Sequence, residues 1–334
     1  MKKIFCLLLA LVMALSLVAC GGNTTDDGGK TPAATKLRFV TGGESGTYYG
    51  FGSVLANHAT NNAGVSVVAL SSDGSKANVI SLEENEAELG FCQSDVMAYA
   101  YNGTNIFADA GKVDCFSVLG ALYTEQVQIV TTNPDIKSVA DLEGKSVSVG
   151  APASGVYFNA VDILSAYGIG DRDADGKFTK INATYQSFSD SADALKNGQI
   201  DAAFIVAGAP TTAVTDLATT KSVSLVSLDD EHIEKLLAAS PYYTKCTISA
   251  DTYNMAADVT TVGVGAVVLV RDDVAEDAVY ALCADIFDDP ASLVSTHGKY
   301  GEVTVDYGAS MTAVPYHPGA AKYFADKGFT VATK

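Results

Sequence analysis

The chain has 334 residues, of which 48% are hydrophobic and 18% charged, so neither a disordered protein nor a collagen-like repeat fits this composition. Its 21 lysines and arginines against 39 aspartates and glutamates give a formal net charge of −18. This acidic balance argues against a nucleic-acid-binding protein and against attachment to an anionic bilayer through basic residues. The length suits two lobes better than one hydrophobic core.

Residues 1–19 are typical of a bacterial lipoprotein signal peptide. Two lysines precede an apolar stretch over residues 4–18, which is too short for an ordinary membrane-spanning helix. The stretch ends in Leu17-Val18-Ala19-Cys20, which resembles a lipobox. We therefore predict cleavage before Cys20 and a diacylglycerol on its thiol, the alternative being an ordinary secretory signal with an incidental cysteine. Residues 20–35, rich in Gly, Thr and Asp, are expected to form a flexible linker.

From residue 36 onward, short apolar runs alternate with amphipathic segments, which predicts an α/β fold. The expected strands cover residues 37–40, 65–70, 88–92, 126–131, 145–149, 202–206, 222–227 and 262–270. The expected helices cover 48–61, 75–86, a segment around 156–167 and one that begins at Asp273.

Two of these strands, 126–131 and 262–270, are candidates for crossing between lobes. The first lobe is then discontinuous, with residues 36–124 plus 266–334 forming lobe I and residues 125–265 forming lobe II. An internal similarity supports two lobes of similar plan, because residues 82–91 can be laid over residues 195–204. Each segment ends a helix, places an acidic residue in the turn (Glu88 or Asp201) and enters an apolar strand.

Several polar turns that lead from a strand into a helix predict a small-molecule site. The turn over residues 41–49 reads T-G-G-E-S-G-T-Y-Y, and residues 71–75, 93–95 and 150–156 repeat the theme. Glycines let the backbone approach a ligand closely, and the free amides of a helix start suit an anion. Each turn alone would be explained as a helix cap, but together they would form a site in one cleft.

The sequence offers little support for catalysis. The segment Gly43-Glu44-Ser45-Gly46-Thr47 does not fit a nucleophile elbow, and the histidines His58, His232, His297 and His317 have no metal-ligand spacing. The cysteines after the linker, Cys92, Cys115, Cys246 and Cys283, form no C-x-x-C pair, so we expect separate thiols, although the sequence leaves their pairing open. We predict a protein that is not an enzyme and requires no cofactor.

A separate acidic loop over residues 171–182 matches the pattern D-x-D-x-D-G of a calcium-binding loop. Asp171, Asp173 and Asp175 would supply carboxylates and Lys177 its carbonyl group. Asn182 stands where a bidentate glutamate is expected. The segment is therefore either a structural calcium site or an acidic surface loop.

Taken in order, the motifs resemble the TAXI family, the extracytoplasmic solute receptors of tripartite ATP-independent periplasmic (TRAP) transporters. The resemblance rests on residues 41–49, Gln93-Ser94-Asp95, residues 138–152, Ala207-Gly208-Ala209-Pro210, Pro241-Tyr242-Tyr243 and His317-Pro318-Gly319-Ala320. It implies a type II periplasmic binding protein fold, in which hinge strands join two α/β lobes with a ligand cleft between them. It also implies capture of a small carboxylate or amino acid of the glutamate, glutamine and 2-oxoglutarate class.

The resemblance further implies which residues bind the ligand. They are Ser45, Gly46, Thr47, Tyr48, Ser75, Gln93 and Ser94 from one lobe and Ser154, Gly155, Val156, Ala209 and Pro210 from the other. Val156 replaces a hydroxyl-bearing residue of the family pattern, and Glu44 adds a negative charge nearby. Both departures favour an amino acid or a less charged carboxylate over a dianion. Asp95 is a candidate to receive an ammonium group, with helix capping as the alternative.

The resulting prediction is a monomeric, lipid-anchored receptor outside the cytoplasm that delivers its solute to TRAP permease subunits and binds no nucleic acid. The same fold would serve a ligand-sensing lipoprotein or the solute-binding protein of an ABC transporter, and these alternatives stay open. A lipid-anchored enzyme is a further alternative, which would need a polar triad or metal cluster in the cleft.

Overall fold

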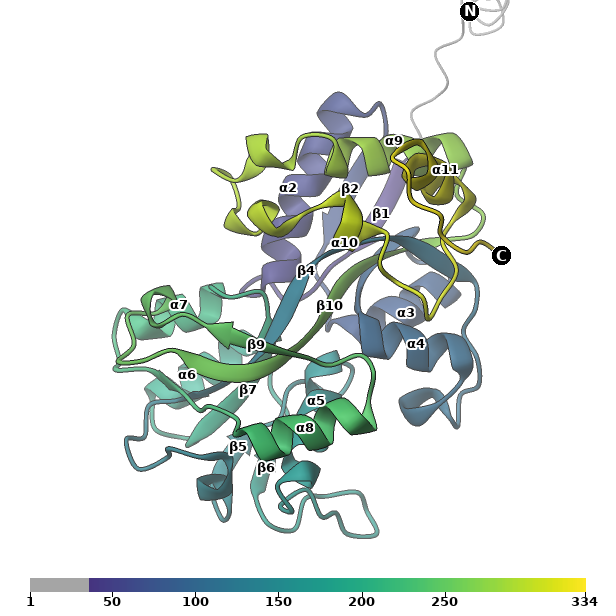
Figure 1. The fold of residues 1–334 in the computed structure, drawn as a ribbon. Coiled ribbons are helices and arrows are strands. Elements are labelled where there is room, and N and C mark those ends of the chain that lie inside the picture. Colours follow the sequence, from purple (N-terminus) through teal and green to yellow (C-terminus); the bar gives the residue numbers. More distant parts are fainter. Residues whose placement is uncertain (1–35) are drawn as a thin grey trace, which may run out of the picture. The chain divides into compact units, whose positions relative to one another are not determined.

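The computed structural model describes residues 36–334 (Figure 1). The predicted signal peptide, the lipidation site Cys20 and the linker lie outside the described residues. Over residues 36–334, no helix combines the length and the apolar character needed to cross a membrane.

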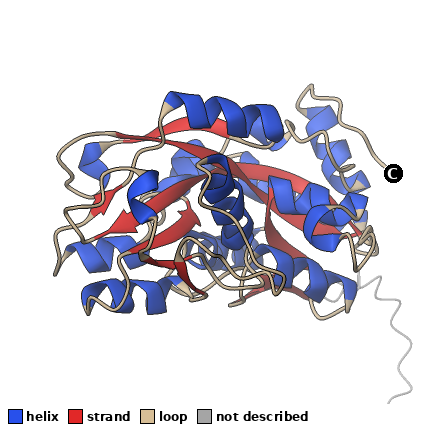
Figure 2. Cartoon of the chain, turned by 90° about the horizontal axis from the view of Figure 1, so that it is seen from below, coloured by secondary structure: helices blue, strands red, loops and turns tan. Residues whose placement is uncertain are grey.

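The described residues form an α/β structure. The strands are β1 (Lys36–Val40), β2 (Ser66–Leu70), β3 (Leu89–Gln93), β4 (Phe116–Thr131), β5 (Ser146–Ser148), β6 (Asn182–Thr184), β7 (Ala202–Ala207), β8 (Ser224–Leu225), β9 (Thr244–Ile248) and β10 (Val259–Arg271). The helices are α2 (Thr47–Asn62), α3 (Ser75–Glu83), α4 (Ser94–Asn102), α5 (Gly155–Ala166), α6 (Phe188–Lys196), α7 (Thr212–Ala218), α8 (Asp230–Ala239), α9 (Glu276–Phe287), α10 (Val305–Gly308) and α11 (Pro318–Asp326). Helices lie on both sides of the strands (Figure 2).

The strands follow the order β2-β1-β3-β10-β4-β7-β5-β6, with β8 beside β4 and β9 beside β10. Strands β1, β2 and β3 are parallel to one another, as are β5, β6 and β7, whereas β10 runs antiparallel to both β3 and β4. The two longest strands, β4 and β10, pair with each other from Gln126 opposite Gly263 to Phe116 opposite Arg271 and link the two parallel groups (Figure 1). This topology confirms the predicted two-lobe α/β fold with its two connecting strands.

Separate hydrophobic cores lie on either side of these connecting strands. One core draws its buried side chains from residues 37–123 and 266–324, with Phe158 of α5 added. Two other cores draw theirs from residues 127–264. We call the two sides lobe I and lobe II, following the sequence analysis, and the predicted boundaries between them stay a prediction.

The internal similarity has a structural counterpart. Glu88 accepts a hydrogen bond from the backbone amide of Arg38 on β1 (2.7 Å), and Asp201 accepts one from the backbone amide of Ser146 on β5 (2.9 Å). In each lobe, an acidic residue before a buried strand therefore ties that strand to its parallel neighbour.

Several element boundaries differ from the prediction. Strand β4 begins at Phe116, ten residues before the predicted start at Gln126. The sequence did not reveal this first part because its side chains are buried on both faces of the sheet and lack the polar–apolar alternation of the later part. Helix α3 ends at Glu83 rather than residue 86, where Asn85 adopts a left-handed conformation (φ 60°). Strand β8 is only two residues long, shorter than the predicted 222–227.

The cysteines of residues 36–334 are separate thiols, as predicted. Cys92 and Cys283 are buried, and Cys115 and Cys246 are half-buried.

Candidate ligand-binding site

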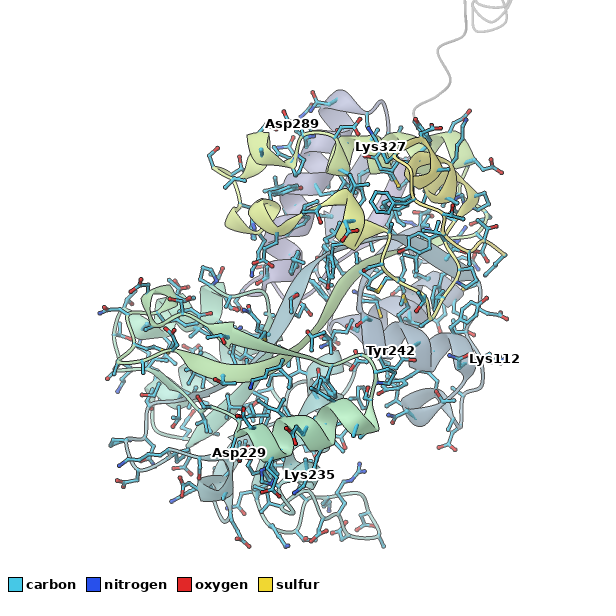
Figure 3. The ribbon with its side chains drawn as sticks, in the orientation of Figure 1. Lys112, Asp229, Lys235, Tyr242, Asp289 and Lys327 are labelled. Atoms are coloured by element: carbon cyan, nitrogen blue, oxygen red, sulfur yellow. The ribbon has the colours of Figure 1, made fainter. Side chains whose placement is uncertain are left out.

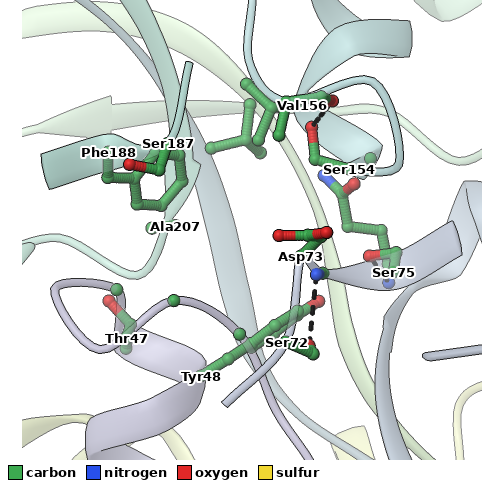
Figure 4. A pocket seen from close by; sticks show the side chains of 18 of the residues that line it. Thr47, Tyr48, Ser72, Asp73, Ser75, Ser154, Val156, Ser187, Phe188 and Ala207 are labelled. Carbon is green, nitrogen blue, oxygen red and sulfur yellow. Dashed lines mark hydrogen bonds between the residues drawn. The ribbon is translucent and has the colours of Figure 1, made fainter. Parts of the chain in front are cut away.

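A pocket of ≈ 120 Å³ opens where the strand-to-helix turns of the two lobes face each other (Figure 4). From lobe I, its walls are Gly42, Gly43, Gly46, Thr47, Tyr48, Ser72, Asp73, Gly74, Ser75 and Gln93. From β4 and lobe II, they are Glu125, Ala151, Ser154, Gly155, Val156, Gln186, Ser187, Phe188, Val206 and Ala207. The strands end at this cleft and the helices begin there, which is where ligands bind in α/β folds.

Eight residues of the predicted ligand set line this pocket: Gly46, Thr47, Tyr48, Ser75, Gln93, Ser154, Gly155 and Val156. Their contact with a ligand stays a prediction. The other four do not line it and have structural contacts instead. The carbonyl of Ser45 accepts from the amide of Ala213 (3.1 Å), the hydroxyl of Ser94 accepts from the amide of Gly265 (2.9 Å), and the amide of Ala209 donates to Gln126 (3.1 Å). Pro210 follows Ala209 through a cis peptide bond.

Three of the hydroxyl groups at the pocket already form hydrogen bonds within the protein. The Thr47 hydroxyl donates to the carbonyl of Gly208 (2.6 Å), and the Ser154 hydroxyl donates to the carbonyl of Ala151 (2.6 Å). The Ser75 hydroxyl accepts from the amide of Gln93 (3.1 Å). Thr47 and Ser154 therefore use their hydroxyl protons within the protein, which leaves the Ser75 hydroxyl and backbone amides as donors for an anionic ligand group.

Such amides are present at two helix starts. Helices α2 and α3 begin at the pocket, and neither Gly46 nor Gly74 at their N-caps supplies a side-chain hydrogen bond. The first backbone amides of an α-helix have no partner within the helix, and the helix dipole gives this end a partial positive charge. Gly74 adopts φ 100°, which favours glycine, so this approach of backbone to the pocket depends on a residue without a side chain.

The charged side chains of the pocket are both acidic. Asp73 and Glu125 are among the lining residues, and no Lys, Arg or His of the described chain is. Glu125 is only 2% exposed, and burial raises the pKa of its carboxyl group from 4.5 to about 8. The Tyr48 hydroxyl lies near enough to offset part of this pKa shift, although no hydrogen bond of ordinary geometry joins it to Glu125.

Two further polar atoms at the pocket lack a partner among the described residues. They are the hydroxyl of Tyr48 and Oε1 of Gln93, both buried. A Cβ placed on Gly155 would lie 1.3 Å from Gln93 Oε1, so only glycine lets helix α5 approach this amide so closely.

The sequence analysis missed several lining residues, above all Asp73, Glu125 and Phe188. Glu125 is a single charged residue within the apolar run of β4, and an isolated charge in such a run was an available signal. Phe188 opens helix α6 directly after the turn that follows β6, so the rule used for the other turns also applies there. Asp73 was part of a turn that the analysis singled out, but its role was not specified.

A buried hydrogen-bond network joins the lobes beside the pocket. Asn159 of α5, fully buried, accepts from Gln93 Nε2 (2.8 Å) and donates to Asp95 Oδ2 (3.0 Å) and to the hydroxyl of Tyr243 (2.8 Å). Tyr243 in turn donates to Asp162 (2.8 Å). Asp95 does not line the pocket, because its carboxylate bonds to Asn159 and to the amide of Val96 (2.8 Å), and burial raises its pKa to about 6.

An aromatic contact extends this junction. Tyr242 lies beside helix α4 (Figure 3), and its ring packs edge-on against Tyr99 with the centroids 5.9 Å apart. The late motif Pro241-Tyr242-Tyr243 thus contacts lobe I through Tyr242, whereas Tyr243 bonds to Asn159 and Asp162 of α5.

The acidic loop over residues 171–182 has the geometry of a hairpin turn. Asp173 accepts from the amides of Asp175 and Lys177 (both 2.9 Å), and Asp171 forms an ion pair with Lys180 (3.0 Å). Within residues 36–334, no three His, Cys, Asp or Glu side chains gather in a way that could hold a metal ion. The calcium hypothesis stays untested, and these contacts favour its alternative, an acidic surface loop.

The model of the NMT1-like family matches residues 39–328, nearly the whole described part of the chain. The chain belongs to the NMT1-like family. Among solved structures, this NMT1-like protein is similar to a protein of Bordetella bronchiseptica RB50 (13% identity, TM-score 0.50, covering 82% of this chain and 77% of that one). This likeness concerns the fold and agrees with the two-lobe topology described above.

Two other similar structures have lower TM-scores. One is the periplasmic aliphatic sulphonate binding protein SsuA from Escherichia coli, with 17% identity, a TM-score of 0.44 and coverage of 88% of this chain and 91% of that one. The other is an ancestral arginine-binding protein bound to arginine, with 16% identity, a TM-score of 0.46 and coverage of 80% and 95%.

Proposed function

We propose that this NMT1-like protein is an extracytoplasmic solute receptor, not an enzyme, which encloses a small amino acid or carboxylate between its two lobes. The observation that supports this most directly is the pocket itself. Turns from both lobes line it, two uncapped helix starts reach it, and its described walls are apolar and hydrogen-bonding groups without a nucleophile–base pair or metal-ligand cluster.

The connecting strands suggest how the receptor works. Because the parallel strands of the two lobes join only through β4 and β10 in the described chain, bending in these strands would open and close the cleft. A solute that contacts both lobes binds the closed form more tightly and therefore shifts the population toward it. The closed surface would then signal to a membrane partner that the receptor is loaded.

The finer assignment is a TAXI-type receptor of a TRAP transporter, anchored through the lipid on Cys20 and delivering its solute to the permease as a monomer. The ordered motifs of the sequence support this assignment. An ABC-type binding protein and a ligand-sensing lipoprotein share the same pocket chemistry and are the competing proposals. Co-purification of the lipidated chain with a many-helix permease, an ATPase complex or a sensor kinase separates the three.

The test of the receptor function is thermal melting of the mature chain with Cys20→Ser, which carries no lipid. The ligands are the standard amino acids, their 2-oxo acids, succinate and 2-oxoglutarate. A solute that binds only the folded state raises the melting temperature with its concentration, by an amount set by RT ln(1 + [L]/Kd). We expect a concentration-dependent rise with at least one solute. No rise with any of them, in protein stripped of carried-over ligand, would contradict capture of this solute class.

A further inference from the structure

We infer that the pocket selects solutes that carry a protonated amine, and that Glu125 is the residue that holds this ammonium group. The inference rests on the proposed function and narrows its ligand class. It favours amino acids with an uncharged side chain over 2-oxo acids and dicarboxylates.

The Glu125 carboxyl group is buried at the pocket without a cationic partner. It is only 2% exposed, no ion pair of the described chain includes it, and the neighbour that offsets its raised pKa most is the uncharged hydroxyl of Tyr48. The other buried acids near the cleft differ, because Asp95 accepts from Asn159 and Asp162 accepts from Tyr243. An unpaired buried carboxylate is costly and therefore takes up a proton, so a carboxyl group that faces a pocket in this state points to a positively charged donor supplied by the ligand.

Several titratable side chains around Glu125 shift its pKa or have their own pKa shifted by it. They are Tyr48 on α2, Cys92 on β3, Asp95 on α4, Tyr123 on its own strand β4, Tyr307 on α10 and Lys299 in the 3-10 helix Gly298–Glu302. Lys299 is the cation of this set, but it forms an ion pair with Glu302 and does not line the pocket. The described part of the protein therefore offers an ionised Glu125 no direct counterion.

The pocket also offers hydrogen-bond acceptors that suit an ammonium group. An ammonium group has three donors and needs three acceptors. Glu125 lines this pocket, and the Tyr48 hydroxyl and Gln93 Oε1 are buried oxygen atoms there without a hydrogen-bond partner in the described structure, so three acceptors are at hand. A ligand with only carboxylate groups would leave Gln93 Oε1 without a donor and would bring a negative charge toward Asp73.

The remaining walls define the rest of the solute. The uncapped starts of α2 and α3 offer backbone amides to one carboxylate. Val156, Phe188 and Val206 supply apolar surface, and no cationic side chain of residues 36–334 lines the pocket to neutralise a second carboxylate. One ammonium group, one carboxylate and an uncharged side chain describe a neutral amino acid.

Binding of an ammonium ligand to Glu125 should release a proton, and this release can be measured. Burial raises the pKa of Glu125 to about 8, so the carboxyl group is mostly protonated in the empty pocket at pH 7. An ammonium ligand pairs with the ionised form, so its binding expels most of a proton into the buffer. Its affinity should rise from pH 6 to pH 9, until the amine of the ligand itself loses its proton.

The experiment is isothermal titration calorimetry on the mature Cys20→Ser chain in two buffers of different ionisation enthalpy at pH 7. Each amino acid that raises the melting temperature is compared with its own 2-oxo acid, and 2-oxoglutarate and succinate are included. We expect the 2-oxo acids to bind at least about tenfold more weakly, as the loss of one charge-assisted hydrogen bond predicts. We also expect amino-acid binding to release protons.

Two variants localise the effect. Glu125→Gln should abolish proton release and most of the preference for the amine. Glu234→Gln, at an exposed position on α8 that does not line the pocket, should retain both. The melting temperature of the parent Cys20→Ser chain and of each variant is recorded without ligand, so that loss of fold is distinguished from loss of selectivity.

Tighter binding of a 2-oxo acid or dicarboxylate than of the matched amino acid would overturn the inference and leave the receptor function standing. Retained amine preference and proton release in Glu125→Gln would also overturn it. Absence of binding by every compound would instead count against the proposed function, and the inference would fall with it.

Discussion

Glu125 illustrates how a single residue can favour ligand binding at the expense of the stability of the empty protein. Its pKa rises from 4.5 to about 8 on burial, so the folded state holds a proton that the unfolded state releases between these pH values. The free energy of unfolding therefore falls as pH rises through this window. A shift of this size corresponds to several kcal/mol, at about 1.4 kcal/mol per pKa unit.

We therefore predict that Glu125→Gln stabilises the ligand-free protein increasingly as pH rises from 5 to 9. At pH 5 the wild-type carboxyl group is protonated in the folded state and resembles the amide, so the two proteins should differ little. Urea denaturation at pH 5, 7 and 9 measures the difference, with Glu44→Gln as the exposed control. A stability difference between wild type and Glu125→Gln that does not grow with pH would contradict this account.

At the same scale, the predicted site was partly recoverable from the sequence. Glycine-rich and serine-rich turns after strands identified Gly46, Thr47 and Ser154 as pocket residues, because turn chemistry is local. The sequence could not show that the hydroxyls of Thr47 and Ser154 are used within the protein, since their acceptors depend on how the chain folds around them.

At the scale of elements, the contact between α5 and α4 depends on one buried amide. Asn159 is fully buried and bonds to Gln93, Asp95 and Tyr243. Its position on α5 was within a predicted helix, but its partners come from two other parts of the chain. The sequence pattern therefore predicted the helix and not the polar junction that it supports.

We predict that Asn159→Ala lowers the free energy of unfolding by about 2–4 kcal/mol. The substitution leaves buried polar groups without a hydrogen-bond partner, and each such group costs about 1–3 kcal/mol. The variant also removes a hydrogen bond that lowers the pKa of Asp95, so the pKa of this residue should rise further. Urea denaturation measures the loss. Asn61→Ala, which removes an exposed side-chain bond to Asn57 on α2, should change stability by less than about 0.5 kcal/mol. Equal losses in both variants would refute a special role for Asn159.

At the scale of the described body, residues 36–334, the alternation of strands and helices predicted the two-lobe fold correctly. The extent of β4 was not predicted, since residues 116–125 are buried on both faces and carry no period-two alternation. This part of β4 pairs with β10 and carries Glu125 at its end. The first part of the connecting strand and the acidic group of the pocket were thus missed for the same reason.

Direct contacts between the lobes across the cleft include hydrogen bonds of ordinary strength. The Thr47 hydroxyl donates to the carbonyl of Gly208 (2.6 Å), and the amide of Ala77 donates to the carbonyl of Ala153 (3.2 Å). Each such bond contributes about 0.5–1.5 kcal/mol, so losing one changes the ratio of closed to open protein by roughly two- to tenfold. When the open and closed forms differ in free energy by only this much, the binding of a small solute is enough to shift the population to the closed form.

Thr47→Val should therefore shift the ligand-free protein toward the open form. The carbonyl of Gly208 still accepts a hydrogen bond from the hydroxyl of Thr211 (3.2 Å) in this variant. The substitution therefore weakens the contact between the lobes and not the folding of lobe II. Small-angle X-ray scattering of the mature Cys20→Ser chain should give a larger radius of gyration for the variant. Saturating solute should bring it back to the wild-type value, because binding energy replaces the lost bond. Thr212→Val, at an exposed position at the start of α7, should leave the radius unchanged, and a Thr47→Val protein as compact as wild type would show that this bond does not hold the cleft closed.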